Sequence, residues 1–481
     1  MKRWLASTMP LVCAVLWAAA CAPPPGTPPR ESSMPTRSRQ PSGPVAQLGP
    51  PPTMKVLTSG LNHPWSLTWG PDNRLWVTEK TGKRVTRIDP VTGATSTVLT
   101  IPEVSASGAQ DGLLGLAFGN EVVYLAYSYN AGTDAAPDLR GKIVRYAYDQ
   151  AAATLRDPVD ILSGLPASRD HDAGRLRVGP DQKLYYSIGD MGNNQFDRAC
   201  LPIRAQDLPT AEQVAAKDWS TYVGKILRLN PDGGVPDDNP VIHGVRSHIY
   251  TYGHRNPQGL AFGPGGRLFS SEHGPKTDDE INLIQAGKNY GWPFVAGFRD
   301  DQAYRYANWS AAPNCAQLKY DDYDIPASVP LGPKETEWND PDYVEPLKTL
   351  YTVPTGHNFK DETCAEEYDL CWPSIAPASV EYFPPEGAPN PALANALLVP
   401  SLKNGSLYVL KLTQDGGSVQ GDVVQLFRTG NRYRDTAISP DRKTIYILTD
   451  SEGLAGPQSG AQSGKLDNPG SVLAFTLTVP K

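Results

Sequence analysis

Short hydrophobic runs joined by turn sequences recur along the chain from residue 54 onward. In each copy a run rich in Leu, Val, Ile or aromatic residues is followed by a turn such as Gly-Pro-Asp, Ser-Pro-Asp or Gly-Asn and by a second run. Proline presets φ for a turn and Gly or Asn tolerates positive φ, so these segments predict β-hairpins. The six predicted hairpins span residues 66–77, 116–124, 176–186, 260–269, 397–409 and 437–447, of which 397–409 has the weakest pattern.

Six copies of a hairpin that cannot bury its own faces predict radial stacking. The fold class is therefore predicted as all-β, a six-bladed β-propeller with long inter-blade insertions. The terminal run 472–477 is expected to close the ring against the first strands. A β-sandwich is the alternative, because the spacing of turns and strands does not count blades. Propellers bind ligands on the loops at one end of the central channel, so we expect the site in residues flanking the hairpins.

The N-terminus has the pattern of an export signal. A basic start precedes the apolar residues 4–20, a stretch too short and too early for a stable membrane span. We therefore predict a signal peptide at 1–20, a Pro-rich disordered tether at 21–53 and the catalytic propeller domain at 54–481. Cleavage before Cys21 and lipidation of Cys21 both remain open. The protein is expected in the periplasm of a bacterium or as a membrane-anchored lipoprotein.

Composition and charge limit the classes of binding partner that we expect for this protein. The 44 Gly and 47 Pro residues suit a chain with many tight turns, and the net charge of −7 makes nucleic acid an unexpected partner. In an oxidising compartment the four cysteines after Cys21 are expected to form disulfides. Cys364 and Cys371 would close a small loop, which leaves Cys200 to pair with Cys315, with free buried thiols as the alternative for the second pair.

Several common catalytic motifs are absent from the sequence: the dinucleotide and phosphate-binding glycine loops, the serine-hydrolase elbow and the zinc helix HExxH. Polar clusters remain in the turn-rich segments 110–112, 170–172, 189–195 and 254–257. Among these, His171 has an adjacent carboxylate and comes just before a predicted strand. An imidazole at the mouth of a blade could act as a general base.

Seven segments of the chain together resemble the soluble quinoprotein glucose dehydrogenases, in unbroken order from about residue 55 to about residue 479. They are 110–115 (QDGLLG), 170–176 (DH..GRL), 253–259 (GHRNPQG), 274–282 (GP..DDEIN), 289–293 (NYGWP), 371–373 (CWP) and 431–435 (NRYRD). The resemblance implies a six-bladed propeller that carries pyrroloquinoline quinone (PQQ) and Ca²⁺. It also implies oxidation of the anomeric carbon of aldose sugars to lactones, a homodimer, and an external electron acceptor that the sequence does not identify.

The resemblance implies a role for each matching residue. His171 corresponds to the general base and Arg255 to the cation that stabilises charge on the quinone oxygens, while Asp170 orients His171 or contacts the sugar. The implied cofactor-binding residues are Asn256, Lys403, Arg432, Arg434 and Gln195. The implied substrate-binding residues are Gln110, Asp170 and Trp372.

Two calcium sites are implied in the same way, since Ca²⁺ takes oxygen ligands and accepts backbone carbonyls. The carbonyls of Gly274 and Pro275 correspond to the site of the cofactor's calcium, which polarises the quinone. A second, structural calcium is implied by side chains of Glu280, Asp300 and Glu335 with carbonyls of Tyr290, Ala296 and Phe298.

The chain departs from the family pattern at two positions. Asp369 stands where the family has a tyrosine over the substrate, so either Tyr368 takes that place or the pocket gains a carboxylate. His273 replaces a glutamine, and it either adds a titrating group near the cofactor or points away.

Two other functions are weighed against a quinone-dependent dehydrogenase. A calcium-dependent propeller lactonase would not need the cations Lys403, Arg432 and Arg434. A non-catalytic, protein-binding propeller would need neither His171 nor Arg255.

Overall fold

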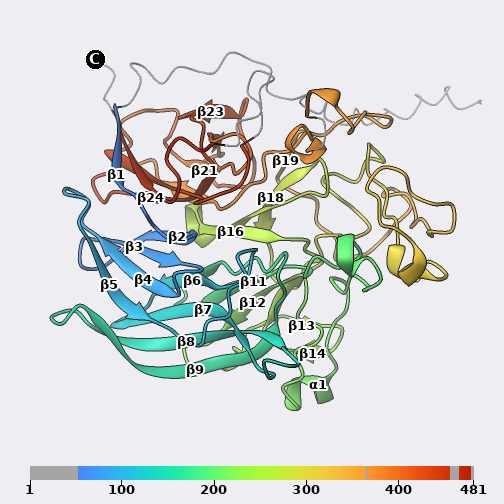
Figure 1. Ribbon diagram of the computed structural model, residues 1–481, viewed down its shortest axis with the longest axis horizontal. Coiled ribbons are helices and arrows are strands. Elements are labelled where there is room, and N and C mark those ends of the chain that lie inside the picture. Colours follow the sequence, from blue (N-terminus) through green and yellow to red (C-terminus); the bar gives the residue numbers. More distant parts are fainter. Residues whose placement is uncertain (1–52, 365–366, 456–464, 478–481) are drawn as a thin grey trace, which may run out of the picture. The chain divides into compact units, whose positions relative to one another are not determined.

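The computed structural model describes residues 53–364, 367–455 and 465–477, which form six antiparallel sheets of four strands (Figure 1). We number these sheets as blades 1 to 6 and list the strands of each in hydrogen-bonded order. Blade 1 contains β2 (Pro64–Trp69), β3 (Leu75–Glu79), β4 (Arg84–Ile88) and β5 (Thr95–Thr100). Blade 2 contains β6 (Leu113–Phe118), β7 (Val122–Asn130), β8 (Leu139–Asp149) and β9 (Thr154–Pro166). Blade 3 contains β10 (Leu176–Val178), β11 (Leu184–Ile188), β12 (Lys225–Leu229) and β15 (Ile249–Tyr252).

The remaining blades have the same four-stranded order. Blade 4 contains β16 (Pro257–Phe262), β17 (Leu268–Glu272), β18 (Asp279–Ile284) and β19 (Lys348–Leu350). Blade 5 contains β20 (Glu381–Phe383), β21 (Ala396–Pro400), β22 (Leu407–Lys411) and β23 (Val424–Leu426). Blade 6 contains β24 (Tyr433–Ile438), β25 (Thr444–Thr449), β26 (Val472–Thr476) and β1 (Thr53–Thr58).

The blades form a closed ring. The first strands contact one another in sequence around it, β2 with β6, β6 with β10, β10 with β16, β16 with β20, β20 with β24, and β24 with β2. In blade 6 the C-terminal strand β26 pairs with both β25 and the N-terminal strand β1. This confirms the predicted propeller and the predicted closure by residues 472–477, and it excludes the sandwich.

Five of the six predicted hairpins are the first two strands of a blade, and all six exist. The exception is 397–409, which forms β21 and β22, the second and third strands of blade 5. The first strand of that blade, β20, has only three residues and is followed directly by Pro384 and Pro385. Proline removes a backbone donor and ends a strand, so this short segment gave no hairpin pattern.

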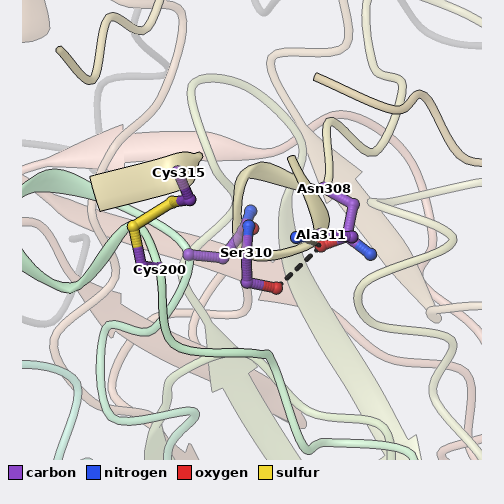
Figure 2. The surroundings of a disulfide bond; sticks show 6 residues. Cys200, Asn308, Ser310, Ala311 and Cys315 are labelled. Atoms are coloured by element: carbon purple, nitrogen blue, oxygen red, sulfur yellow. Dashed lines mark hydrogen bonds between the residues drawn. A yellow bond between two sulfur atoms is a disulfide. The ribbon is translucent and has the colours of Figure 1, made fainter. Parts of the chain in front are cut away.

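Three long insertions join strands on the ring. They comprise residues 189–224 before β12, 285–347 before β19, and 351–380 before β20. The disulfide Cys200–Cys315 links the first insertion to the second (Figure 2), and Cys364–Cys371 closes a loop in the third. Both predicted pairings are confirmed. The only α-helix of the described residues is α1 (Ala211–Ala215), and a small hairpin pairs β13 (Val241–Ile242) with β14 (Val245–Arg246).

The predicted signal peptide, nearly all of the predicted tether and Cys21 lie outside the described residues. Within the described residues, no helix has both the length and the apolar character that crossing a bilayer requires.

A buried ion pair lies where the first strands meet. Arg175, just before β10, is 0% exposed and donates through Nη1 to Asp435 Oδ2 of β24 at 2.7 Å. The same guanidinium donates to the carbonyl of Gln258 in β16 at 2.9 Å, to Ser66 Oγ in β2 at 3.2 Å and to the carbonyl of Ala378 before β20 at 3.2 Å. Ser66 in turn donates to the carbonyl of Leu114 in β6 at 2.9 Å. This central ion pair therefore connects all six blades.

We predict that Arg175→Met destabilises the fold by about 3–5 kcal/mol, because Asp435 would be left as a buried unpaired charge. Urea unfolding followed by circular dichroism measures the change in free energy. Arg140→Met is the matched control, since the Arg140–Asp138 pair is exposed and should contribute at most about 1 kcal/mol. Equal destabilisation by the two substitutions would contradict a special role for the central ion pair.

Candidate active site

A cavity of about 430 Å³ opens at one edge of the ring. Gln110, His171, Arg255 and Arg432 line it, and each lies shortly before the first strand of its blade. Other lining residues follow second strands: Lys80 after β3, His273 after β17, Lys403 after β21 and Asp450 after β25. In an antiparallel pair one strand begins at the edge where its partner ends. The blades thus bring distant polar residues to one place, as the hairpin pattern predicted.

The imidazole of His171 is held by a carboxylate from the neighbouring strand. Its Nδ1 lies 2.6 Å from Asp190 Oδ1, and the other oxygen of Asp190 accepts the indole N–H of Trp292 at 2.8 Å. Burial opposes ionisation of Asp190, but its interactions with His171 and the charge of Arg255 outweigh burial and hold the pKa of Asp190 below its usual range. A carboxylate acceptor requires the proton on Nδ1, which leaves Nε2 as the basic nitrogen.

Local backbone geometry allows this approach. Asp190 follows the end of β11 by two residues, and His171 has a left-handed backbone with φ of 50°. A Cβ at Gly189 would lie 1.9 Å from the carbonyl oxygen of His171, so only glycine permits the two segments to come this close.

Asp170 accepts the backbone N–H of His171 at 2.9 Å but does not hold its imidazole. Its Oδ1 is 3.9 Å from His171 Nε2, and its carboxylate instead accepts the amides of Gln110 at 2.5 Å and Gln195 at 3.1 Å. The role of orienting the imidazole, considered for Asp170, belongs to Asp190. The position of Asp190 just after the end of a strand could have indicated this from the sequence. Gln195 Nε2 also lies 3.4 Å from His171 Nε2, which fits an unprotonated Nε2.

An amide network extends from Asp170 across the ring. Gln110 Oε1 accepts hydrogen bonds from Asn256 at 3.2 Å and Gln258 at 3.0 Å, and Gln258 accepts one from Arg434 at 3.0 Å. The predicted residues Asp170, Gln110, Asn256 and Arg434 are thereby brought into one network. Asn256 and Asp170 are not among the residues that line the cavity, but the Asp170 side chain is 37% exposed.

Cations gather on the opposite wall. Arg432 and Arg434 both bond to Asp450, at 3.2 Å and 2.7 Å, and the Arg434 guanidinium lies 4.4 Å from the ring of Trp65. Lys403 donates to the carbonyl of Trp372 at 2.5 Å, and burial lowers its pKa to about 8.

Sequence reasoning missed a further lysine in this wall. Lys80 donates to the carbonyl of Ala109, and burial together with the charge of Arg434 lowers its pKa to about 8. It also missed Asp450, which lies 16 and 18 residues from Arg434 and Arg432, and Gln258, whose partners Gln110 and Arg434 are 148 and 176 residues away.

Arg255 lies between His171 and the loop that follows β17. Its Nη1 donates to the carbonyl of His273 at 3.3 Å, and its guanidinium lies 5.4 Å from the ring of Trp292. Arg255 Nε, Asn256 Oδ1 and His273 Nε2 are buried without a hydrogen-bond partner among the described residues. Buried polar atoms are normally satisfied, so their concentration here indicates a polar ligand.

Asp369 and His273, the two residues that depart from the family pattern, both lie at the cavity. Asp369 lines the cavity, whereas the ring of Tyr368 lies 5.8 Å from that of Tyr323, so the pocket gains a carboxylate. His273 also lines the cavity, and burial followed by the charge of Arg255 keeps its pKa well below the usual value. The imidazole of His273 is therefore neutral.

The predicted metal ligands fall in two places. Gly274 and Pro275 line the cavity, where the Gly274 N–H donates to Asp279 at 3.0 Å. Glu280 and Glu335 lie away from the cavity and both accept backbone N–H groups of one turn, Glu280 from Gly297 at 2.7 Å and Glu335 from Ala296 at 3.0 Å.

This turn also contains Phe298 and Asp300, whereas the ring of Tyr290 stacks on His254 at 4.7 Å. Burial and neighbouring carboxylates raise the pKa of Glu280 well above its usual value and that of Glu335 to about 8. A cluster of buried carboxylates that repel one another is a donor set suited to Ca²⁺. No group of three or more His, Cys, Asp or Glu side chains in metal-binding geometry is found within residues 53–364, 367–455 and 465–477.

Comparison with known proteins finds relatives of this chain in both sequence and structure. A family model described as glucose/sorbosone dehydrogenase matches residues 61–320. Quinoprotein glucose dehydrogenase B of Acinetobacter calcoaceticus is 47% identical over 432 residues, which cover 88% of this chain and 90% of that protein.

Solved structures show the same fold. An oxidoreductase (glucose dehydrogenase) of Thermus thermophilus is 27% identical with a TM-score of 0.59, over 88% of this chain and 99% of that one. The PQQ-bound aldose sugar dehydrogenase of Streptomyces coelicolor, at 24% identity and a TM-score of 0.59, covers 89% of this chain and 99% of its own, and supports the fold alone.

We predict that Asp190→Asn changes the tautomer of His171, because an amide can present an N–H donor to Nδ1 where the carboxylate only accepts. The imidazole ¹⁵N chemical shifts of the apoprotein report which nitrogen carries the proton. Asp170→Asn is the matched control and should leave the tautomer as it is. A tautomer change in the Asp170 variant alone would contradict the assignment.

Proposed function

The chain belongs to the glucose/sorbosone dehydrogenase family, and from this premise we propose that it is a quinoprotein that oxidises the anomeric carbon of aldose sugars to lactones. The observation that carries the proposal is the meeting of His171, held by Asp190, with Arg255 and the cations Lys403 and Arg434 around one cavity. A base, an electrophile and an anion-binding wall are the three parts that such a reaction needs from the protein.

The residues present fit the cofactor. PQQ carries three carboxylates, and Lys403, Arg432 and Arg434 would bind them, with Asn256 adding a hydrogen bond. The carbonyls of Gly274 and Pro275 would hold its calcium ion. The unpartnered atoms Arg255 Nε and His273 Nε2 support a polar group in this cavity. When bound, PQQ supplies the acceptor for the hydride and Ca²⁺ polarises it.

His171 Nε2 takes the proton of the anomeric hydroxyl as the hydride leaves the same carbon. Asp190 stabilises the imidazolium that forms and keeps the ring in place. Arg255 carries a permanent positive charge and stabilises the negative charge that develops on the accepting oxygens. Gln110 and Asp170 bind sugar hydroxyls, Trp372 offers an aromatic face to the pyranose, and Gln195 contacts the cofactor.

The structural calcium remains part of the proposal. Glu280, Asp300 and Glu335 would contribute side-chain oxygens, and Tyr290, Ala296 and Phe298 carbonyls, at the turn where Glu280 and Glu335 meet. Export, a lipid anchor on Cys21 and a homodimer also remain predictions, and the physiological electron acceptor is unassigned. The relatives named as quinoprotein or PQQ-bound dehydrogenases are bacterial, which supports a bacterial source.

The central test adds PQQ and Ca²⁺ to the purified apoprotein and follows dye reduction with glucose and a panel of other aldoses. Sugar-dependent reduction is expected. Lactone hydrolysis without added PQQ would instead favour the calcium-dependent lactonase. Bound cofactor without reduction for any aldose would refute the dehydrogenase.

We predict that His171→Ala lowers kcat by about 10²–10⁴-fold, because removal of a general base typically costs this much. Steady-state kinetics measure kcat, and equilibrium titration should show that PQQ still binds. His243→Ala is the control, since His243 is exposed in the β13–β14 turn. Turnover retained by the His171 variant would remove this residue from the mechanism.

We predict that Ca²⁺ raises the Tm of the apoprotein, because a ligand that binds only the folded state stabilises it by about 2.7 kcal/mol at 100 times its Kd. Differential scanning calorimetry with and without Ca²⁺ measures the shift. Glu335→Gln should reduce the shift, whereas Glu345→Gln should retain it because Glu345 is exposed and outside the proposed ligand set. A shift of equal size in the Glu335 variant would argue against this ligand.

A further inference from the structure

Four carboxylates line the main cavity described above, and three of them are bound within the chain. Asp279 accepts three backbone N–H groups at 2.5 to 3.1 Å. Asp450 binds the two arginines of the cation wall, and Glu452 lies 2.9 Å from His63 Nε2. Asp369 is the exception, because its side chain forms no hydrogen bond or ion pair with the described residues. A carboxylate at a cavity without a partner of its own is available to a ligand.

The backbone that carries this carboxylate is held in place. Asp369 belongs to the 3₁₀ turn Tyr368–Leu370, which lies inside the loop closed by the disulfide Cys364–Cys371. Leu370 is buried and also lines the cavity. Asp369 itself is exposed, so its carboxylate lies at the mouth of the cavity and remains accessible to a ligand that enters.

The aromatic residue proposed to stack on the sugar follows this turn directly. The backbone N–H of Trp372 donates to the carbonyl of Asp369 at 3.3 Å. The indole N–H of Trp372 donates to Tyr323 Oη at 3.1 Å, and its carbonyl accepts from Lys403 at 2.5 Å. Because these contacts fix the ring of Trp372, we expect a sugar stacked on it to lie beside the carboxylate of Asp369.

Two lysines near this aromatic face have other partners. Lys276 Nζ lies 6.0 Å from the ring centroid of Trp372 and pairs with Asp322 at 3.7 Å. Lys403 is within electrostatic reach of Asp369, but in the proposed function Lys403 binds a carboxylate of the cofactor. With the cofactor bound, the negative charge of Asp369 is therefore left to attract a positively charged ligand.

We propose that Asp369 binds the ammonium group of amino sugars, so that the substrates of this site include cationic aldoses such as glucosamine. The proposal rests on the proposed function, because the sugar is oxidised at the same anomeric carbon. The hydride leaves that carbon for the cofactor, the hydroxyl proton goes to His171, and the ammonium group is unchanged. A carboxylate forms a charge-assisted hydrogen bond with ammonium, and the face of a tryptophan also attracts this cation.

The first test compares aldoses of different charge in the enzyme loaded with PQQ and Ca²⁺. The probes are glucosamine, glucose and glucuronate, which are cationic, neutral and anionic. Asp369→Asn removes the charge and keeps the shape of the side chain. The ratio of kcat/KM for glucosamine to that for glucose should fall about two- to fivefold, as expected of an exposed ion pair, and the ratio for glucuronate should rise.

Asp157→Asn is the matched control, because Asp157 is exposed on the outermost strand of blade 2. It should leave both ratios unchanged. In the wild-type enzyme the ratio for glucosamine should also fall as ionic strength rises, because salt screens exposed charge pairs. The ratio of Asp369→Asn should change less.

The second test measures binding without turnover. Isothermal titration calorimetry of the loaded enzyme, without oxygen or an electron acceptor, gives the Kd of each sugar. We expect Asp369→Asn to raise the Kd of glucosamine about two- to fivefold and to leave that of glucose unchanged.

Unchanged ratios and an unchanged Kd for glucosamine in Asp369→Asn would overturn the proposal. Equal losses for glucosamine and glucose would also overturn it, because the carboxylate would then bind a hydroxyl group. Failure to oxidise any aldose would instead refute the proposed function, and the calorimetric Kd values would still decide whether Asp369 binds the ammonium group.

Discussion

The closed ring depends on the buried ion pair between Arg175 and Asp435. Taking two charges out of water costs several kcal/mol, which only a complete set of hydrogen bonds offsets. The guanidinium finds its acceptors in blades 1, 4, 5 and 6, and Ser66 extends the set to blade 2. Because the pair is satisfied only when all six blades are in place, it favours one ring with one register over partial or shifted assemblies.

The same strands connect this ion pair to the site. On β24 the register with β25 shifts between Tyr433 and Asp435, and at this irregularity Arg434 lines the cavity while Asp435 reaches the ion pair. Gln258 connects the central ion pair to the cavity wall, because its backbone carbonyl accepts a hydrogen bond from Arg175 and its side chain accepts one from Arg434. Arg434 is therefore positioned in the cavity wall by the core of the ring.

The sequence predicted those parts of this arrangement that are local. Turn residues between apolar runs located the hairpins, and a place just before a predicted strand singled out His171, whereas Arg255 and Arg432 were assigned to the site only by the family resemblance. Partnerships across the ring could not be predicted, because Arg175 and Asp435 are 260 residues apart and become neighbours only on closure. Asp190 is a different case, because it flanks the same hairpin as His171, and sequence reasoning preferred Asp170 only because it is adjacent to His171 in sequence.

Cations are concentrated at the main cavity. The chain has a net charge of −7, yet the cavity lining includes Lys80, Arg255, Lys403, Arg432 and Arg434, together with the carboxylates of Asp279, Asp369, Asp450 and Glu452. Burial lowers the pKa of both lysines to about 8, and the charge of Arg434 adds to the effect on Lys80. These cations are held close together in a partly desolvated site. An anionic ligand would reduce the repulsion between them, whereas a neutral lactone would not.

Arg432 and Arg434 share the carboxylate of Asp450, which fixes their geometry before a ligand arrives. Such preorganised charge suits the three carboxylates of PQQ and explains why an acidic protein concentrates cations at this edge of the ring.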